Sequence, residues 1–369
     1  MYSRKEYLKH GILFFLTLIA ATLSGAEWVF GKSVLGTEDS ALTWTYFWKS
    51  TAYSLPFIGI LFVHEMGHLF TSIHHRVKCS LPFFIPAWLG FIGAPSIGTF
   101  GAVIQMKGFI NSRKKYFDIG VAGPLAGFVI ALGVLIYGFQ TLPEPSYLYE
   151  IHPEYADPDF QGYGEEALNF ELGPNLLFEG LKLTFADAER MPAMSEVIHY
   201  PFLFAGYLAL FFTALNLLPI GQLDGGHVIF GLFPKYHSQI SLVAFTAFLS
   251  YAGLGIIHPY LPSEDLIFTI PLYLGFLFIC YQKTGLSLLN RITIVLTMSS
   301  TQYALVYFKP EWEGYQGWLL FGFLIGRVMG VRHPEVSGTR EISRGRKIIG
   351  WLAILIFILC FSPKPFIFE

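Results

Sequence analysis

Long apolar stretches separated by short polar segments dominate the chain. Nine windows of about 20 mostly apolar residues occur, which is the length an α-helix needs to cross the hydrocarbon core of a bilayer. The two windows between residues 285 and 330 are the weakest, so we expect an all-α polytopic membrane protein with eight or nine transmembrane helices. The windows lie near residues 11–30, 52–73, 117–139, 201–220, 239–258, 266–282, 285–307, 316–330 and 348–362.

The basic residues between these windows predict the orientation. If the windows alternate from a cytoplasmic N-terminus, the inner segments hold 18 of the 24 lysines and arginines. Inner loops carry an excess of these residues, so we expect the N-terminus to be cytoplasmic. The first window also suits a cleavable signal peptide, because Arg4, Lys5 and Lys9 precede it. In either case Glu27 lies on the outer side.

Two segments between the windows have a distinct composition. Residues 141–200 contain 12 Asp and Glu but only Lys182 and Arg190 as basic residues, which predicts an extracytoplasmic loop with little regular structure. Residues 81–107 are apolar yet rich in Gly and Pro, and are therefore a poor spanning helix. Non-helical backbone at membrane depth must be buried in protein or line a wet cavity. We expect a re-entrant, β-hairpin-like segment with a strand at 98–106; an ordinary surface loop is the alternative.

Composition and charge support a membrane protein and disfavour other classes. The chain of 369 residues is 53% hydrophobic and only 14% charged, with a mean hydropathy of +0.52. A soluble domain is about 25% charged, so the composition disfavours a soluble globular protein. The formal net charge of −2 gives no reason to expect a nucleic-acid partner. The lipid bilayer is the expected environment, and the sequence leaves the oligomeric state open.

The second window contains a motif of polar residues that suits metal chemistry. His64, Glu65 and His68 stand within the apolar run of residues 61–70. Residues four apart lie on one face of a helix, so both imidazoles can aim at one point. This is the zinc-binding HExxH spacing, in which the glutamate takes a proton from the bound water. Such polar groups are costly in a membrane and are usually functional. The pattern predicts one Zn²⁺ per chain.

A catalytic zinc needs a third protein ligand and an open position. Asp118 opens the third window, but it follows three basic residues and suits an interfacial ion pair better. Asp224 follows the fourth window. The second and fourth windows both run from outside to inside in the orientation given above, and each motif lies near the cytoplasmic end, so the two can meet.

These motifs resemble those of the site-2 protease family of intramembrane zinc metalloproteases. The family's two signatures are HExxH on one span and NxxPxxxxDG on a later one. Both are complete here, in His64, Glu65 and His68 and in Asn216, Pro219, Asp224 and Gly225. Residues 117–128 resemble the small-residue third core span of the family. The resemblance covers about residues 50–230, without an insertion that has the strand pattern of a PDZ domain.

The resemblance implies a role for each motif residue. His64, His68 and Asp224 would be the zinc ligands, and Glu65 the general base. Asn216 would donate to the developing oxyanion, with a helix-packing hydrogen bond as the alternative. Pro219 would end or kink its helix, and Gly225 with the following glycine would permit a tight turn.

The predicted function is a zinc-dependent endopeptidase that hydrolyses a peptide bond within or near a transmembrane segment of another protein. The resemblance also implies regulated intramembrane proteolysis of membrane-tethered regulators, with clearance of membrane remnants equally allowed. One alternative is an HExxH metalloprotease with a glutamate ligand, although Glu264, Glu311 and Glu313 fall in predicted outer loops. A polytopic transporter or an inactive scaffold is the other.

The organisation follows from these assignments. We expect an N-terminal span and outer loop in residues 1–50, a catalytic membrane core in 51–230 and additional spans in 231–369. The protein is predicted to be multi-pass in the plasma (inner) membrane, with its active site toward the cytoplasmic side and a transmembrane protein as substrate.

Overall fold

The protein is built mainly of helices. The computed structural model describes residues 2–108, 110–157, 170–334, 336 and 341–368. These divide into two compact units, each described by itself. Unit 1 comprises residues 1–110, 122–215 and 355–369, and unit 2 comprises residues 111–121 and 216–354.

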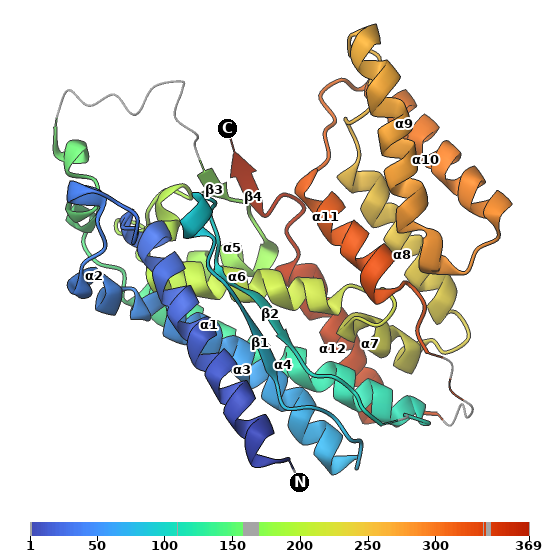
Figure 1. Cartoon of the computed structure of the whole chain (residues 1–369), viewed down its shortest axis with the longest axis horizontal. Helices are drawn as coiled ribbons and strands as arrows, with labels where there is room; N and C mark the ends of the chain where they lie inside the picture. The colour runs from blue at the N-terminus through green and yellow to red at the C-terminus, as the bar shows by residue number, and fades with distance from the viewer. Residues whose placement is uncertain (1, 109, 158–169, 335, 337–340, 369) are drawn as a thin grey trace. The chain divides into compact units, whose positions relative to one another are not determined.

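Unit 1 combines long apolar helices with two small sheets (Figure 1). Its helices are α1 (Arg4–Phe30), α2 (Trp44–Lys49), α3 (Thr51–His74), most of α4 (Arg113–Gln140), α5 (Leu176–Phe185) and most of α6 (Pro201–Leu217). Its sheets are antiparallel pairs: β1 (Phe83–Ala87) with β2 (Gly98–Val103), and β3 (Phe170–Leu172) with β4 (Phe366–Phe368).

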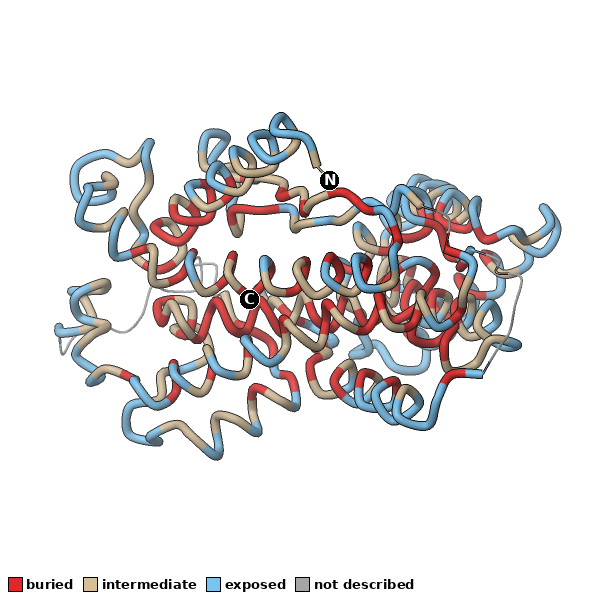
Figure 2. Tube along the Cα trace, turned by 90° about the horizontal axis from the view of Figure 1, so that it is seen from below, coloured by how far each residue is buried: buried red, intermediate tan, exposed pale blue. Residues whose placement is uncertain are grey.

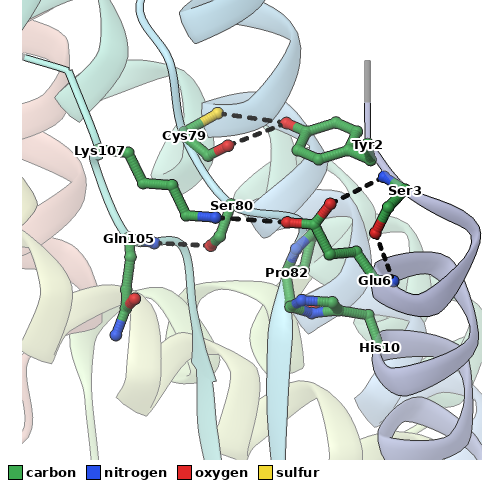
Figure 3. Close-up of polar contacts among 9 residues, drawn as sticks. All are labelled: Tyr2, Ser3, Glu6, His10, Cys79, Ser80, Pro82, Gln105 and Lys107. Carbon is green, nitrogen blue, oxygen red and sulfur yellow. Dashed lines mark hydrogen bonds and ion pairs between the residues drawn. The ribbon is translucent and has the colours of Figure 1, made fainter.

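Helix α1 runs beside the hairpin of β1 and β2 and fixes its open end (Figure 1). The helix begins with a capping box, in which Ser3 and Glu6 satisfy each other's backbone N–H groups. Figure 3 shows Lys107, which follows β2, reaching Glu6 at 3.4 Å. In the same view Nδ1 of His10 donates to the carbonyl of Pro82 at 2.8 Å. The hairpin is therefore anchored to the first turns of α1.

Aromatic packing holds α1, α3 and α6 together within unit 1. The ring of Tyr53 stacks on those of Phe57 and Phe204, with centroids 5.5 and 5.2 Å apart. All three are fully buried or nearly so, and Figure 2 shows how such buried positions alternate with exposed ones along the helices. Gly25 lets α1 approach Tyr53, because a Cβ there would lie 2.6 Å from the ring. The close contact positions α3, which carries the HExxH motif.

Unit 2 is helical within the described residues. It contains the first turns of α4, then α7 (Asp224–Leu232), α8 (His237–Ala252), α9 (Ser263–Cys280), α10 (Leu288–Phe308), α11 (Gly317–Phe323), a π-helical turn (Leu324–Met329) and most of α12 (Arg344–Cys360). The buried guanidinium of Arg113 donates to the carbonyl of Gly231 at 2.6 and 3.0 Å, which satisfies a backbone acceptor at the end of α7.

Helices occupy the predicted windows, but fewer of them meet the criteria for a membrane span. Among the described residues, four helical stretches are long and apolar enough to cross a bilayer: Arg4–Phe30, Trp44–His74, Arg113–Gln140 and Ser263–Thr284. Helix α6 and the stretch Gly317–Met329 are apolar but shorter. The count of eight or nine spans therefore stays a prediction.

The two unusual segments differ in detail from expectation. The predicted strand at 98–106 is β2, which ends at Val103, and its pairing with β1 gives the expected hairpin. Its re-entrant position in a membrane stays a prediction. The expectation of little regular structure in 141–200 was wrong for part of that segment: it holds α5, β3 and the 3-10 turns Pro145–Glu150, Pro153–Ala156 and Glu196–His199. Helix α5 forms because Asn175 caps it and its apolar residues share a face. Residues 158–169 lie outside the described residues.

Candidate metal centre

Helix α3 brings the two histidines of the HExxH motif together in unit 1. The Nε2 atoms of His64 and His68 are 3.0 Å apart, and their ring centroids are 4.8 Å apart. Both imidazoles and the carboxylate of Glu65 are buried, with at most 8% of each residue exposed. The i, i+4 spacing explains the arrangement, because it places the two side chains one above the other on one helix face.

Glycines of α4 leave the room that the two imidazoles occupy. A Cβ on Gly123 would lie 2.1 Å from Nε2 of His68, and one on Gly127 would lie 3.1 Å from the Cβ of His64. On α3 itself, a Cβ on Gly67 would lie 2.6 Å from the carbonyl oxygen of Ala122. The small-residue stretch of α4 therefore serves close packing against the motif helix, as it does in other helix pairs in membranes.

The donor set of this pair fits zinc. With Zn–N bonds of about 2.0–2.1 Å, two ligands of a tetrahedral ion lie about 3.3 Å apart. The observed separation of 3.0 Å is close to that value, and imidazole nitrogen is a preferred zinc donor. A methyl group on Gly123 would occupy the space that the imidazole of His68 fills. The site therefore accommodates both imidazoles in their observed positions because this residue is glycine.

The second motif forms a tight turn in unit 2. Asn216 is in the last turn of α6, which ends at Leu217, and Asp224 is the first residue of α7. Pro219 lies in the turn between them. A Cβ on Gly225 would lie 2.0 Å from the carbonyl oxygen of Leu217, so glycine is required for the chain to double back so closely. The histidines belong to unit 1 and Asp224 to unit 2, and Asp224 as a zinc ligand stays a prediction.

Two other polar residues, Asp118 and His227, have partners of their own. The carboxylate of Asp118 accepts two hydrogen bonds from the guanidinium of Arg346, at 2.6 and 2.9 Å. This bidentate contact confirms the predicted ion pair, and its position at a membrane interface stays a prediction. Nδ1 of His227 lies 2.8 Å from Nε2 of His333, which is 106 positions further along the chain.

A second group of possible metal ligands lies in unit 1 and was not predicted. His152, Glu196 and His199 each offer a ligand atom, and these atoms all lie within 4.8 Å of one another. Burial lowers the pKa of His199 below its ordinary value and raises that of Tyr155, whose hydroxyl donates to Glu196. His152 and His199 are 47 positions apart, so no short motif marks the group.

Comparison with known proteins agrees with the motifs. The model of Peptidase family M50 matches residues 52–259. A probable zinc metalloprotease EGY1, chloroplastic, from Oryza sativa subsp. japonica is 33% identical over 178 residues, which are 48% of this chain and 27% of that protein. Its namesake from Arabidopsis thaliana is 30% identical over 184 residues, 48% of this chain and 29% of that protein.

A probable zinc metalloprotease EGY2, chloroplastic, from Oryza sativa subsp. indica is 30% identical over 187 residues, 50% of this chain and 30% of that protein. The matched regions thus span less than a third of the length of these relatives. No solved structure matches the chain.

Proposed function

The chain belongs to Peptidase family M50, and from that premise we propose that it is a zinc-dependent intramembrane endopeptidase that hydrolyses a peptide bond within or near a transmembrane segment of another protein. The buried pair of imidazole nitrogens 3.0 Å apart on apolar helix α3 carries this proposal. Three relatives of the chain are named probable zinc metalloproteases.

His64, His68 and Asp224 would hold the zinc ion, which when bound supplies Lewis-acid activation of a water molecule. Glu65 directly follows the first histidine, and its buried carboxylate accepts the proton that the attacking water loses. The same group can then return the proton to the leaving amine. Helix α3 provides the dry surroundings in which such a carboxylate is an effective base.

Asn216 would serve the carbonyl side of the reaction. Its amide donates to the oxygen that becomes negatively charged as water attacks, which a preorganised donor stabilises most in a site without bulk water. The turn from Asn216 to Asp224 fixes both residues, because Gly225 packs directly on the carbonyl of Leu217. The motif thus joins an oxyanion donor to a metal ligand through a short, rigid segment.

The hairpin offers a way to hold the substrate extended. A peptide bond in a helix is shielded by its own hydrogen bonds, and addition of the unwound segment to a strand edge would expose it. Strand β2 pairs with β1 on one side, and its residues Phe100 and Val103 are exposed. We therefore propose β2 as the substrate-binding edge.

Val103→Pro tests this edge. Loss of one backbone hydrogen bond to the substrate should lower cleavage about tenfold without loss of zinc. Val103→Ala keeps the N–H and is the matched control. Unchanged cleavage by Val103→Pro would reject the edge.

The membrane and sidedness are also proposed. We propose the plasma (inner) membrane as the location. The excess of basic residues on one side favours the orientation in which the HExxH end of α3 faces the cytoplasm. The relatives are named chloroplastic, which describes those proteins. Labelling of cysteines introduced at exposed positions such as Glu150 and Tyr236, in intact and permeabilised cells, tests the orientation.

Zinc content and cleavage together test the proposed enzyme. Asp224→Ala in the detergent-purified full chain should lose the zinc held by His64 and His68 and with it the cleavage of a single-span protein tagged at both ends. Asp265→Ala is the matched control, because Asp265 is also acidic and in the first turn of a helix, α9. Retention of this zinc by Asp224→Ala would indicate a glutamate ligand or His227. Absence of zinc from the wild type would indicate a scaffold.

A further inference from the structure

The second ligand group lies where three distant parts of unit 1 meet. His152 precedes the 3-10 turn Pro153–Ala156, Glu196 and His199 bound the turn Glu196–His199, and Val29 is in the last turn of α1. Nε2 of His152 is 3.1 Å from Nε2 of His199, and Oε2 of Glu196 is 3.6 Å from the same atom of His199. The side chains are 23%, 18% and 10% exposed for His152, Glu196 and His199.

The Nδ1 atoms of the two imidazoles face away from this meeting point, and their hydrogen-bond partners indicate which ring nitrogen carries the hydrogen. Nδ1 of His199 is 2.8 Å from the carbonyl oxygen of Val29, and Nδ1 of His152 is 3.0 Å from a carboxylate oxygen of Glu154. Carbonyl and carboxylate oxygens only accept, so each Nδ1 must carry the hydrogen. With Nδ1 as the donor, Nε2 is the nitrogen that each neutral imidazole offers to a metal ion. The two Nε2 atoms face each other at 3.1 Å, which suits two ligands of one ion.

Glu196 adds a third donor to the same point. The hydroxyl of Tyr155 donates to Oε1 at 3.0 Å, which holds the carboxylate in place. Oε2 is buried and has no hydrogen-bond partner among the described residues. A buried carboxylate oxygen left in this way is costly unless a cation is close.

Another histidine pair shows that such contacts do not all need an ion. In unit 2, Nδ1 of His333 lies 2.8 Å from the carbonyl of Pro334, so its Nε2 is the acceptor. Nδ1 of His227, 2.8 Å away, can donate to it. One nitrogen donates and the other accepts, so both rings stay neutral. The His152–His199 contact differs because Oε2 of Glu196 lies beside it, so this group offers three ligand atoms to one ion.

We propose that His152, Glu196 and His199 bind a divalent transition-metal ion of the zinc class, at a site separate from the catalytic pair. Imidazole nitrogens select such an ion over Ca²⁺ or Mg²⁺, which prefer oxygen ligands. The 3.1 Å separation is close to the roughly 3.3 Å expected between tetrahedral zinc ligands. The acceptors on both Nδ1–H groups are the partners that metal-bound histidines have in proteins.

The ion would fasten the acidic segment to the end of α1. His152 and His199 are 47 positions apart, and His199 also bonds to Val29. A metal that joins the ends of a long loop removes much of the conformational freedom of the unliganded chain. We infer a structural site, because its ligands come from distant parts of the chain and the ion would hold them together.

Metal stoichiometry of the full chain tests the site. The protein is purified in detergent, equilibrated with zinc chloride, passed through a desalting column and analysed for zinc. Wild type should bind about two ions per chain, and His64→Ala/His68→Ala about one. Adding Glu196→Gln or His199→Ala to that double variant should remove the second ion. Glu150→Gln, an exposed glutamate of the same segment, is the matched control and should change nothing.

Further readouts separate this site from the catalytic one and from misfolding. Zinc should slow trypsin cleavage at Lys182 and Arg190 in the wild type but not in Glu196→Gln, and Glu196→Gln should still cleave a membrane substrate. No zinc in His64→Ala/His68→Ala, or one ion retained after Glu196→Gln is added, would overturn the site and favour a shared proton. A single ion that survives His64→Ala/His68→Ala but not Glu196→Gln would instead reject the proposed protease.

Discussion

The His64–His68 and His152–His199 pairs of unit 1 reach nearly the same geometry by different routes. Their Nε2 atoms are 3.0 and 3.1 Å apart. The first pair is set by one turn of a single helix, so the local backbone holds it with little help. The second pair depends on loop closure over 47 positions and on Glu154 and Val29, whose oxygens accept from the two Nδ1 atoms. Local geometry suits the proposed catalytic site, which must stay rigid, whereas loop closure suits the proposed structural site, where the metal itself would provide rigidity.

The largest effect is expected when the proposed general base is replaced and the His64–His68 pair is kept. Glu65→Gln should lower cleavage about 10³-fold, because a neutral amide cannot accept the proton of the attacking water. Zinc content should stay as in the wild type, since the variant keeps both histidines. Cleavage of a doubly tagged single-span protein and zinc analysis on one preparation measure this. Cleavage within a few-fold of the wild type would show that Glu65 is not the base.

The next effect tests whether α4 shapes the first pair. Gly123→Ala places a methyl carbon 2.1 Å from Nε2 of His68, so the ring or the helix must move by about 1 Å. Misplacement of that size costs about 100-fold in rate, and we expect such a loss of cleavage with weaker zinc binding. Gly133→Ala is the control on the same helix, because its Cβ meets no described heavy atom within 4 Å. If both variants lose cleavage equally, the contact with His68 is not the cause.

The contrast between geometry set within one helix and geometry set by distant segments explains which features could be predicted from the sequence. Apolar windows near 52–73 and 117–139 correspond to α3 and α4, because long apolar runs have few alternatives to helix. The HExxH spacing located the first pair, since four positions along a helix fix a distance. The strand near 98–106 was marked by Gly and Pro, which disfavour helix there.

The rest depends on contacts that no local pattern encodes. Helix α5 was missed because the charge of the whole acidic segment outweighed its capped, amphipathic ten residues. The group of His152, Glu196 and His199 was missed because its members meet only after the chain folds. Helices α8 and α12, of 16 and 17 residues, show that an apolar window predicts a helix better than it predicts a membrane span.

A smaller effect should distinguish the second pair from the first. Tyr155→Phe removes the hydroxyl that donates to Oε1 of Glu196, but it leaves all three ligands. Loss of such a supporting hydrogen bond weakens metal binding about tenfold. Zinc titration of His64→Ala/His68→Ala with and without Tyr155→Phe measures the change. Cleavage by the single variant Tyr155→Phe should not change, and a parallel loss of cleavage would mean that the two metal sites are coupled.

The smallest effect measures how far His64 can be displaced before cleavage by the first pair falls. A methyl group on Gly127 would lie 3.1 Å from the Cβ of His64 and 3.4 Å from its Nδ1, so a shift of a few tenths of an ångström suffices. If about 1 Å costs 100-fold, this shift costs about fourfold in cleavage rate. Gly127→Ala should therefore fall between Gly133→Ala and Gly123→Ala in one assay. A loss as large as that of Gly123→Ala would show that the orientation of His64 is held more tightly than that of His68, and that the pair is not a symmetric clamp.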